Sequence, residues 1–117
     1  MNIEEYRNYC LSKPCVTEHF PFDETTLVFK VCNKIFTISR LERVPPAINL
    51  KCDPERAVKL REEYDGKILP GYHMNKKHWN TVEITNLSYD FLIELIDHSY
   101  DLIVKSLPKK VQEEMMK

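Results

Sequence analysis

The connections between regular segments constrain this fold more than any other feature of the 117-residue sequence. Helix and strand patterns follow one another in the order α-β-β-β-α-β-β-α, and the connections are too short for the crossovers of a doubly wound parallel sheet. The sequence therefore predicts an α+β fold in two layers, an antiparallel sheet with helices packed on one face. A chain of this length is usually one domain, so we expect a single domain over residues 1–117.

Local signals set the boundaries of the expected elements. Asn2 and Glu5 have the spacing of a capping box, Asn33 tolerates the left-handed backbone of a tight hairpin, and Asp53-Pro54 supplies an N-cap and a first helical residue. The expected elements are helices over residues 2–13, 54–64 and 88–107, strands over 26–32, 35–40, 47–51, 68–69 and 79–84, and a short helix in the tail after Pro108. The run 20–22 is interpreted as an extended lead into a turn.

Composition and charge narrow the function. Apolar residues make up 43% of the chain and charged residues 30%, which is typical of an ordinary globular protein. The sequence has neither an apolar run of about 20 residues nor the order of a secretory signal, so we expect a cytoplasmic protein without membrane contact. The net charge of −1 argues against nucleic-acid binding by the whole surface, so any anion-binding face must be local.

The most specialised segment is 70–82, which holds two Lys, two His, two Asn, a Tyr and the only Trp without a carboxylate. Cations, amides and flat rings contact phosphates and bases, which indicates nucleic-acid binding. A polar turn leading into a strand, with Trp79 and Val82 in the core, is the alternative interpretation. The candidate nucleic-acid-binding residues are Lys67, His73, Asn75, Lys76, Lys77 and His78, with Arg40, Arg43 and Lys51 as further candidates.

Backbone conformation decides how these side chains point. If the segment is extended, His73, Asn75 and Lys77 share one face, and Met74, Lys76 and His78 share the other. Asn80 is interpreted as a local backbone capper. Trp79 is expected to be largely buried and, with Val82 and Ile84, to cover the third helix.

Metal binding and catalysis have no supporting pattern. The four cysteines lack C-x-x-C spacing and are expected to be free thiols, with Cys10, Cys32 and Cys52 packed inside. His73 and His78 have no acid or thiol nearby to complete a zinc site, so we expect no metal. His98, between Asp97 and Asp101, is expected to make a structural hydrogen bond.

The chain also lacks the patterns of common catalytic and cofactor sites. It has two glycines, which rules out a Gly-rich nucleotide loop, and neither a nucleophile elbow nor a catalytic carboxylate pair stands out. We therefore expect no cofactor and no enzymatic activity.

Three motifs carry a family resemblance: NLKCDP at 49–54, PGYHMNKKHWNTV at 70–82 and LIDHSYDL at 95–102. They closely resemble the MmcQ/YjbR family of small bacterial proteins, and the match spans nearly the whole chain, including 9–12 and 20–22. Asp23 is a departure, because many relatives have Gly there, which affects the following turn. The resemblance implies a two-layer α+β fold similar to frataxin-like and secretion-chaperone-like domains, and DNA binding by a double-wing motif.

These observations predict a DNA-binding accessory or regulatory protein without catalytic activity. Binding is expected to be weak, salt-dependent and centred on Lys76 and Lys77, with the protein as a monomer. The alternative is a protein-interaction or chaperone-like module that uses an exposed apolar face. A basic patch around Lys76 and Lys77 would favour the first function, and a contiguous apolar patch the second.

Overall fold

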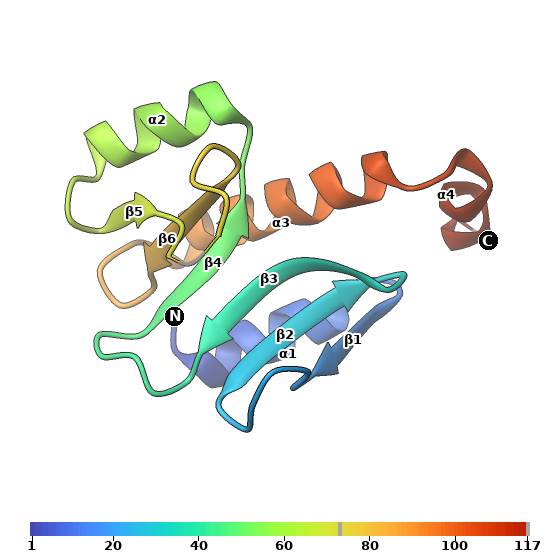
Figure 1. Ribbon diagram of the computed structural model, residues 1–117, viewed down its shortest axis with the longest axis horizontal. Helices are drawn as coiled ribbons and strands as arrows, with labels where there is room; N and C mark the ends of the chain where they lie inside the picture. Colours follow the sequence, from blue (N-terminus) through green and yellow to red (C-terminus); the bar gives the residue numbers. More distant parts are fainter. Residues whose placement is uncertain (73, 117) are drawn as a thin grey trace.

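Six strands form one antiparallel sheet in the spatial order β1-β2-β3-β4-β6-β5 (Figure 1). The structure is a computed structural model that describes residues 1–72 and 74–116. Its strands are β1 (Val16–His19), β2 (Thr26–Val31), β3 (Lys34–Arg40), β4 (Ala47–Lys51), β5 (Ile68–Pro70) and β6 (Trp79–Glu83). Its helices are α1 (Ile3–Ser12), α2 (Pro54–Glu63), α3 (Tyr89–Ser106) and α4 (Lys109–Met115).

Three helices, α1, α2 and α3, cover one face of the sheet, and none of them lies on the other face. In Figure 1, α1 lies behind β2 and β3, and α3 passes behind β4. The buried core lies between these two layers. It joins apolar residues of α1, α2 and α3 to alternate residues of the strands, including Tyr6, Leu60, Leu92, Phe29, Ile48 and Val82. The predicted α+β fold with helices on one face of an antiparallel sheet is therefore confirmed.

Local capping and turn signals act as the sequence predicts. The capping box of α1 is complete, because Glu5 N donates to Asn2 Oδ1 (2.8 Å) and Asn2 N donates to Glu5 Oε1 (3.1 Å). Asp53 caps α2 ahead of Pro54. Asn33 has φ 69°, and with Cys32 at φ 47° it forms the tight β2–β3 turn.

Two differences concern elements and their order. β1 was not expected, since residues 14–22 were interpreted as a helix stop and an extended lead. Val16 to His19 nevertheless pair with β2, where Thr17 lies opposite Lys30. With β1 and α4 the order becomes α-β-β-β-β-α-β-β-α-α. Cys32 lies in the hairpin turn and is half-buried, rather than continuing a strand into the core.

The prediction that Trp79 packs with Val82 and Ile84 over the third helix is wrong. Val82 and Ile84 belong to the core cluster, with exposures of 2% and 0%. Successive side chains of a strand alternate between faces, so Trp79, three positions before Val82, points to the opposite face. Trp79 is accordingly half-buried on the face without helices. We call that face, which also carries Asn49, Lys51 and Thr81, the open face.

The two halves of the sheet diverge between β3 and β4. A register shift leaves Phe36 without a partner on β2, and Phe36 and Thr37 both point toward the helices. β3 and β4 then pair at Thr37 with Leu50 and at Ile38 with Asn49. Side-chain groups bridge the rest of this junction: Thr37 Oγ1 donates to Asn49 O (2.9 Å), and Ser39 Oγ donates to Ala47 O (3.2 Å). We call this junction the β3–β4 seam.

Within the part of the chain that the structure describes, no helix combines the length and apolar character needed to cross a membrane.

Candidate functional site

A cavity of about 510 Å³ lies on the open face beside the β3–β4 seam. β3 ends there, while β4, β5 and β6 supply its floor and far side. Its lining consists of Arg40, Glu42, Arg43, Ala47, Asn49, Leu69, Pro70, Tyr72 and Thr81. We call it the Arg40 cavity. The cavity forms because β3 and β4 separate at the seam, where side-chain hydrogen bonds replace part of the backbone pairing.

A hydrogen-bonded chain forms the polar floor of the Arg40 cavity. Asn49 Nδ2 donates to Ile38 O (3.3 Å), and Asn49 Oδ1 accepts from Thr81 Oγ1 (2.6 Å). Thr81 Oγ1 in turn accepts from the backbone N–H of Tyr72 (3.1 Å). Asn49 and Thr81 are buried at 7% and 3% exposure. The network therefore fixes the backbone that presents Tyr72 at the rim.

Two guanidinium groups and one aromatic ring form the rim. The Arg40 guanidinium lies 5.8 Å from the centroid of the Tyr72 ring, within the range of a cation–π contact. Arg43 Nη1 donates to Pro45 O (2.6 Å), which holds this side chain against the β3–β4 loop. Glu42 is the one carboxylate among the lining residues. Guanidinium groups bind phosphates and carboxylates through paired hydrogen bonds, so this rim suits an anionic ligand with a flat ring.

The segment 74–78 is a turn leading into β6, as the alternative interpretation of segment 70–82 has it, so the extended arrangement of its side chains does not apply. Asn75 O accepts hydrogen bonds from His78 N (3.2 Å) and Trp79 N (3.0 Å), and Asn75 Oδ1 accepts from Lys77 N (2.9 Å). Asn75 is thus the local backbone capper of this segment, and its side-chain oxygen is already engaged. His73 lies outside the described residues.

Asn80 has a different role from the local capping expected for it. It is 2% exposed and joins β6 to α2: its Oδ1 accepts from Arg61 Nε (2.8 Å), and its Nδ2 donates to Ala57 O (3.4 Å). Arg61 Nη2 also donates to Lys76 O (2.5 Å). The turn is therefore held against α2 through its backbone, which leaves the Lys76 side chain exposed.

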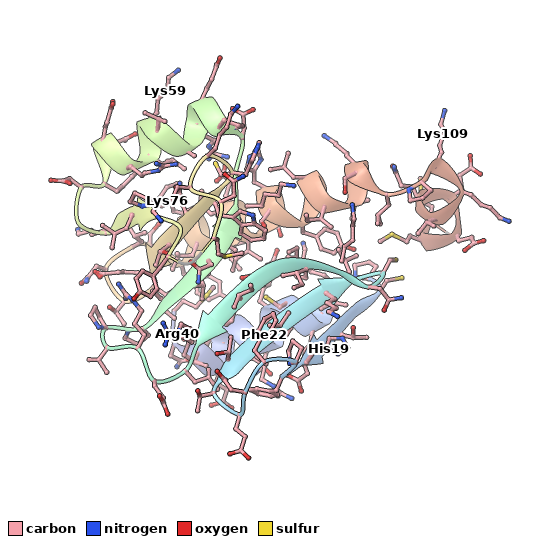
Figure 2. The ribbon with its side chains drawn as sticks, viewed as in Figure 1. His19, Phe22, Arg40, Lys59, Lys76 and Lys109 are labelled. Carbon is pink, nitrogen blue, oxygen red and sulfur yellow. The ribbon has the colours of Figure 1, made fainter. Side chains whose placement is uncertain are left out.

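The structure separates the predicted cationic residues. Lys76 and Lys77 line a shallow depression at the start of α2, where Glu55 also lies. Lys67 is exposed before β5, and half-buried His78 accepts a bond from Cys52 N (2.8 Å) through its carbonyl. Figure 2 shows Lys76 and Arg40 at different places on the molecule. The structure thus brings Arg40, Arg43 and Tyr72 together at one cavity and places Lys76 and Lys77 side by side at another site.

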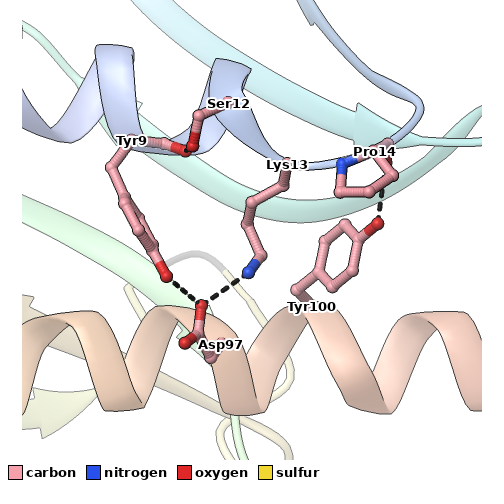
Figure 3. Close-up of polar contacts among 6 residues, drawn as sticks. All are labelled: Tyr9, Ser12, Lys13, Pro14, Asp97 and Tyr100. Carbon is pink, nitrogen blue, oxygen red and sulfur yellow. Dashed lines mark hydrogen bonds and ion pairs between the residues drawn. The ribbon is translucent and has the colours of Figure 1, made fainter.

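Polar contacts between α1 and α3 are structural. Asp97 Oδ1 accepts from both Tyr9 OH and Lys13 Nζ at 2.5 Å (Figure 3). Tyr100 OH donates to Pro14 O (2.7 Å), and Lys13 Nζ lies 4.5 Å from the centroid of the Tyr100 ring. Burial and the neighbouring Asp97 carboxylate raise the pKa of the Tyr9 hydroxyl. Since each donor meets an acceptor, this cluster joins the two helices.

His98 makes the structural hydrogen bond that was expected, though with a different kind of partner. Its Nε2 accepts from the backbone N–H of Asp53 (3.3 Å), at the N-cap of α2. Burial, and then the nearby Arg56 cation, lower the pKa of the imidazole. Among residues 1–72 and 74–116, no three His, Cys, Asp or Glu side chains gather as a metal site would require.

The sequence contained one signal for the Arg40 cavity that was not used. Asn49 and Thr81 are polar residues on strands with many apolar neighbours, and buried polar side chains must find partners. Their pairing across β4 and β6 could have marked a polar floor on the open face. Tyr72 counted only as a member of segment 70–82, and Arg40 and Arg43 were further nucleic-acid-binding candidates whose position relative to Tyr72 was not predicted.

Comparisons with known proteins agree on one family. The YjbR family model matches residues 11–102. The chain is 40% identical over 111 residues to Escherichia coli O157:H7 YbdF, covering 94% of this chain and 90% of that protein. It is 33% identical to YjbR of Escherichia coli K12 over 94% and 93% of the two chains.

Two solved structures superpose closely on this chain. The crystal structure of the Deinococcus radiodurans protein DR2400 superposes with a TM-score of 0.91 at 37% identity, over 97% of this chain and 87% of that one. A Pseudomonas syringae protein gives a TM-score of 0.75 at 27% identity, over 87% and 98%. With the family model matched over residues 11–102 and relatives covered over most of their length, the chain belongs to the YjbR family.

Proposed function

We propose that this protein binds DNA weakly through the open face of its sheet, with the Arg40 cavity at the centre of the contact. The observation that carries the proposal is the placement of Arg40, Arg43 and Tyr72 around one cavity. Guanidinium groups would contact phosphates, and the tyrosine ring would stack on a base. The proposal assigns a binding role without catalysis, to a monomer.

The distribution of charge supports this orientation. Alternation along β2, β3 and β4 directs Lys30, Arg40 and Lys51 to the open face, where Glu83 on β6 and Glu42 at the Arg40 cavity are opposing charges. On the helix side α3 is acidic, since it carries Asp90, Glu94, Asp97 and Asp101 against Lys105, with Lys13 and Arg56 paired to two of these carboxylates. A polyanion would therefore approach the open face more readily than the helices.

The exposed rings favour single strands over duplexes. Tyr72 is 59% exposed at the cavity, and half-buried Trp79 lies opposite Lys51 on the same face. Bases can stack on such rings only when they are unpaired, and an open antiparallel sheet with rings beside cations is a known platform for single strands. Lys76, Lys77, Lys67 and His78 are outlying contacts in this proposal.

Fluorescence polarisation with labelled single-stranded and duplex DNA at several salt concentrations tests the proposal. If Arg40, Arg43 and Lys51 neutralise three phosphates, log K should fall with log salt at a slope near −2 for single strands, with Kd of about 10⁻⁴–10⁻⁶ M. Replacing Arg40 and Arg43 by Gln should flatten that slope by about 1.4.

Matched double variants distinguish binding at a local site from an effect of the protein's net charge. The double variant Lys76→Gln, Lys77→Gln removes the same number of positive charges from segment 70–82. It should flatten the salt slope less than the Arg40/Arg43 variant does. Lys59→Gln with Lys109→Gln removes two charges from α2 and α4 (Figure 2) and should leave binding unchanged. Equal binding by the Arg40/Arg43 variant and the Lys59/Lys109 variant would contradict the assignment of the cavity.

A protein partner is the second candidate, and one surface favours it. Phe20 and Phe22 are 48% and 66% exposed and line a shallow depression with Pro21 and Asp23. Exposed aromatic side chains in one short segment are unusual without a partner. Wild-type protein that binds neither form of DNA at low salt would favour this candidate.

A further inference from the structure

Cys15 and Cys32 lie opposite each other where β1 begins and the β2–β3 turn closes. Val16 pairs with Val31, so the next position outward brings Cys15 opposite Cys32, and Cys32 N donates to Cys15 O (3.3 Å). This hydrogen bond continues the β1–β2 pairing by one position and keeps the two backbones close, while disulfides span Cα separations of about 4.4–6.8 Å. The backbone spacing therefore suits a disulfide.

The two thiols are themselves neighbours. Burial raises the pKa of the Cys32 thiol, and the charge and hydrogen bonding of the Cys15 thiol raise it further. Burial, followed by these same two cysteines, raises the pKa of Tyr100 to about 12. The Cys15 and Cys32 thiols thus lie close to each other and in the neighbourhood of Tyr100, and Glu114 of α4 also acts on Cys32.

Local conformation does not account for cysteine at these positions. Cys15 has φ 62° and Cys32 has φ 47°, which is the left-handed region. Gly and Asn adopt this region more readily than Cys, and either would suit a bend or a tight turn. Core packing does not account for Cys15, which is exposed, although the half-buried Cys32 packs against the edge of the core.

We infer that Cys15 and Cys32 form a dithiol site that low-molecular-weight disulfides oxidise to an intramolecular disulfide. In the first step the Cys15 thiolate attacks one sulfur of the small disulfide, forms a mixed disulfide and releases one small thiolate. The Cys32 thiolate then attacks the Cys15 sulfur and releases the second. Two electrons pass to the small disulfide, and the two cysteine protons end on the two small thiols.

Exposure sets the order of these steps. Cys15 is exposed and meets the small disulfide first, whereas the half-buried Cys32 completes the exchange. Cys10 and Cys52 are 0% and 4% exposed, and burial raises the pKa of the Cys10 thiol to about 12. Both remain thiols, because exchange requires an accessible thiolate.

The disulfide would join the start of β1 to the β2–β3 turn. It would close a loop that contains β1, the exposed Phe20 and Phe22, and β2. Cross-linking restricts the unfolded chain, so the oxidised protein should melt at a higher temperature than the reduced protein.

Oxidised glutathione is the probe for this site. The reduced native protein is incubated with it and quenched in acid, the remaining thiols are alkylated, and the products are identified by intact mass and peptide mapping. Two of the four thiols should be lost without added glutathione mass, and the linked peptides should contain Cys15 and Cys32.

Variants and a denatured control test each step. Cys32→Ser should accumulate glutathione at Cys15, because the second attack is lost. Cys15→Ser should react more slowly and form no internal disulfide. Wild-type protein in urea should lose the preference for this pairing. Persistent glutathione on wild-type Cys15, covalent dimers, or four unreacted thiols would each overturn the inference.

Discussion

His98 is a residue whose protonation state is tied to the fold. Its Nε2 accepts a hydrogen bond from Asp53 N, which only the unprotonated nitrogen can do. Burial and Arg56 lower its folded-state pKa below the ordinary value of about 6.5. Between this lowered folded-state pKa and about pH 6.5, the unfolded chain therefore binds more protons at His98 than the folded chain does.

The stability contribution of His98 should follow from this linkage. It should be fully present above about pH 6.5 and should be lost as pH falls through the lowered folded-state pKa. Urea unfolding at several pH values between 5 and 8, compared with His98→Gln, isolates the effect, since Gln can accept the Asp53 hydrogen bond but does not titrate. His19→Gln, which removes an imidazole from β1, should keep the wild-type dependence. A His98→Gln profile parallel to wild type would contradict the prediction.

At the scale of elements, the two glycines of the chain serve different purposes. Gly66 has φ +80° after α2, and a Cβ added there meets nothing within 4 Å. A Cβ on Gly71 would lie 2.8 Å from Trp79 Cβ and 2.9 Å from Trp79 O. Gly71 N also donates to Trp79 O (2.9 Å), so this clash falls on the backbone that joins β5 to β6.

Gly71→Ala should therefore weaken the β5–β6 pair. We expect a loss of about 1–3 kcal/mol in the free energy of unfolding, because backbone atoms must move apart. Gly66→Ala should lose about 1 kcal/mol through its positive φ alone. Hydrogen exchange distinguishes the two variants: only Gly71→Ala should speed exchange of the backbone amides at positions 71 and 72. Unchanged exchange there would show that the strands absorb the added methyl group.

Elements with local signals were the ones that the sequence could predict. The capping box at Asn2 and Glu5 and the Asp53-Pro54 start of α2 depend on neighbours in the chain, and both are confirmed. β1 was missed because it gains its strand conformation by pairing with β2, which has no short-range signature. Lys76 and Lys77 were chosen from the composition of segment 70–82, whereas the turn that directs them was only the alternative interpretation of that segment.

The candidate site depends on still longer-range relations. Asn49 and Thr81 are 32 residues apart in sequence, and their hydrogen bond exists only because β4 and β6 are neighbours. Arg40 and Arg43 could be named as cations from the sequence. Their position beside Tyr72 could not be predicted, because it depends on the separation of β3 from β4 at the Arg40 cavity.

At the scale of the whole molecule, one hydroxyl of the helix layer holds together the two halves of the sheet. Ser99 of α3 is 0% exposed and lies at the β3–β4 seam. Its Oγ donates to Phe36 O on β3 (2.5 Å) and accepts from Lys51 N on β4 (2.9 Å). The hydroxyl thus satisfies one backbone group on each strand where the ladder between them is incomplete.

Ser99→Ala should expose this dependence of the fold on one side chain. It leaves the Phe36 carbonyl and the Lys51 amide without this partner inside the molecule, so we expect a loss of about 1–3 kcal/mol in the free energy of unfolding. Exchange of the Lys51 amide should become faster, while amides in the β2–β3 hairpin keep their protection relative to global unfolding. Ser106→Ala is the matched control on the same helix, because the exposed Ser106 hydroxyl donates to Ile103 O (2.6 Å) and accepts from the exposed Lys34 side chain (3.1 Å), so it contacts no backbone group of the β3–β4 seam. Equal losses for the two variants would mean that the seam is held by Thr37, Ser39 and Asn49 without help from the helix layer.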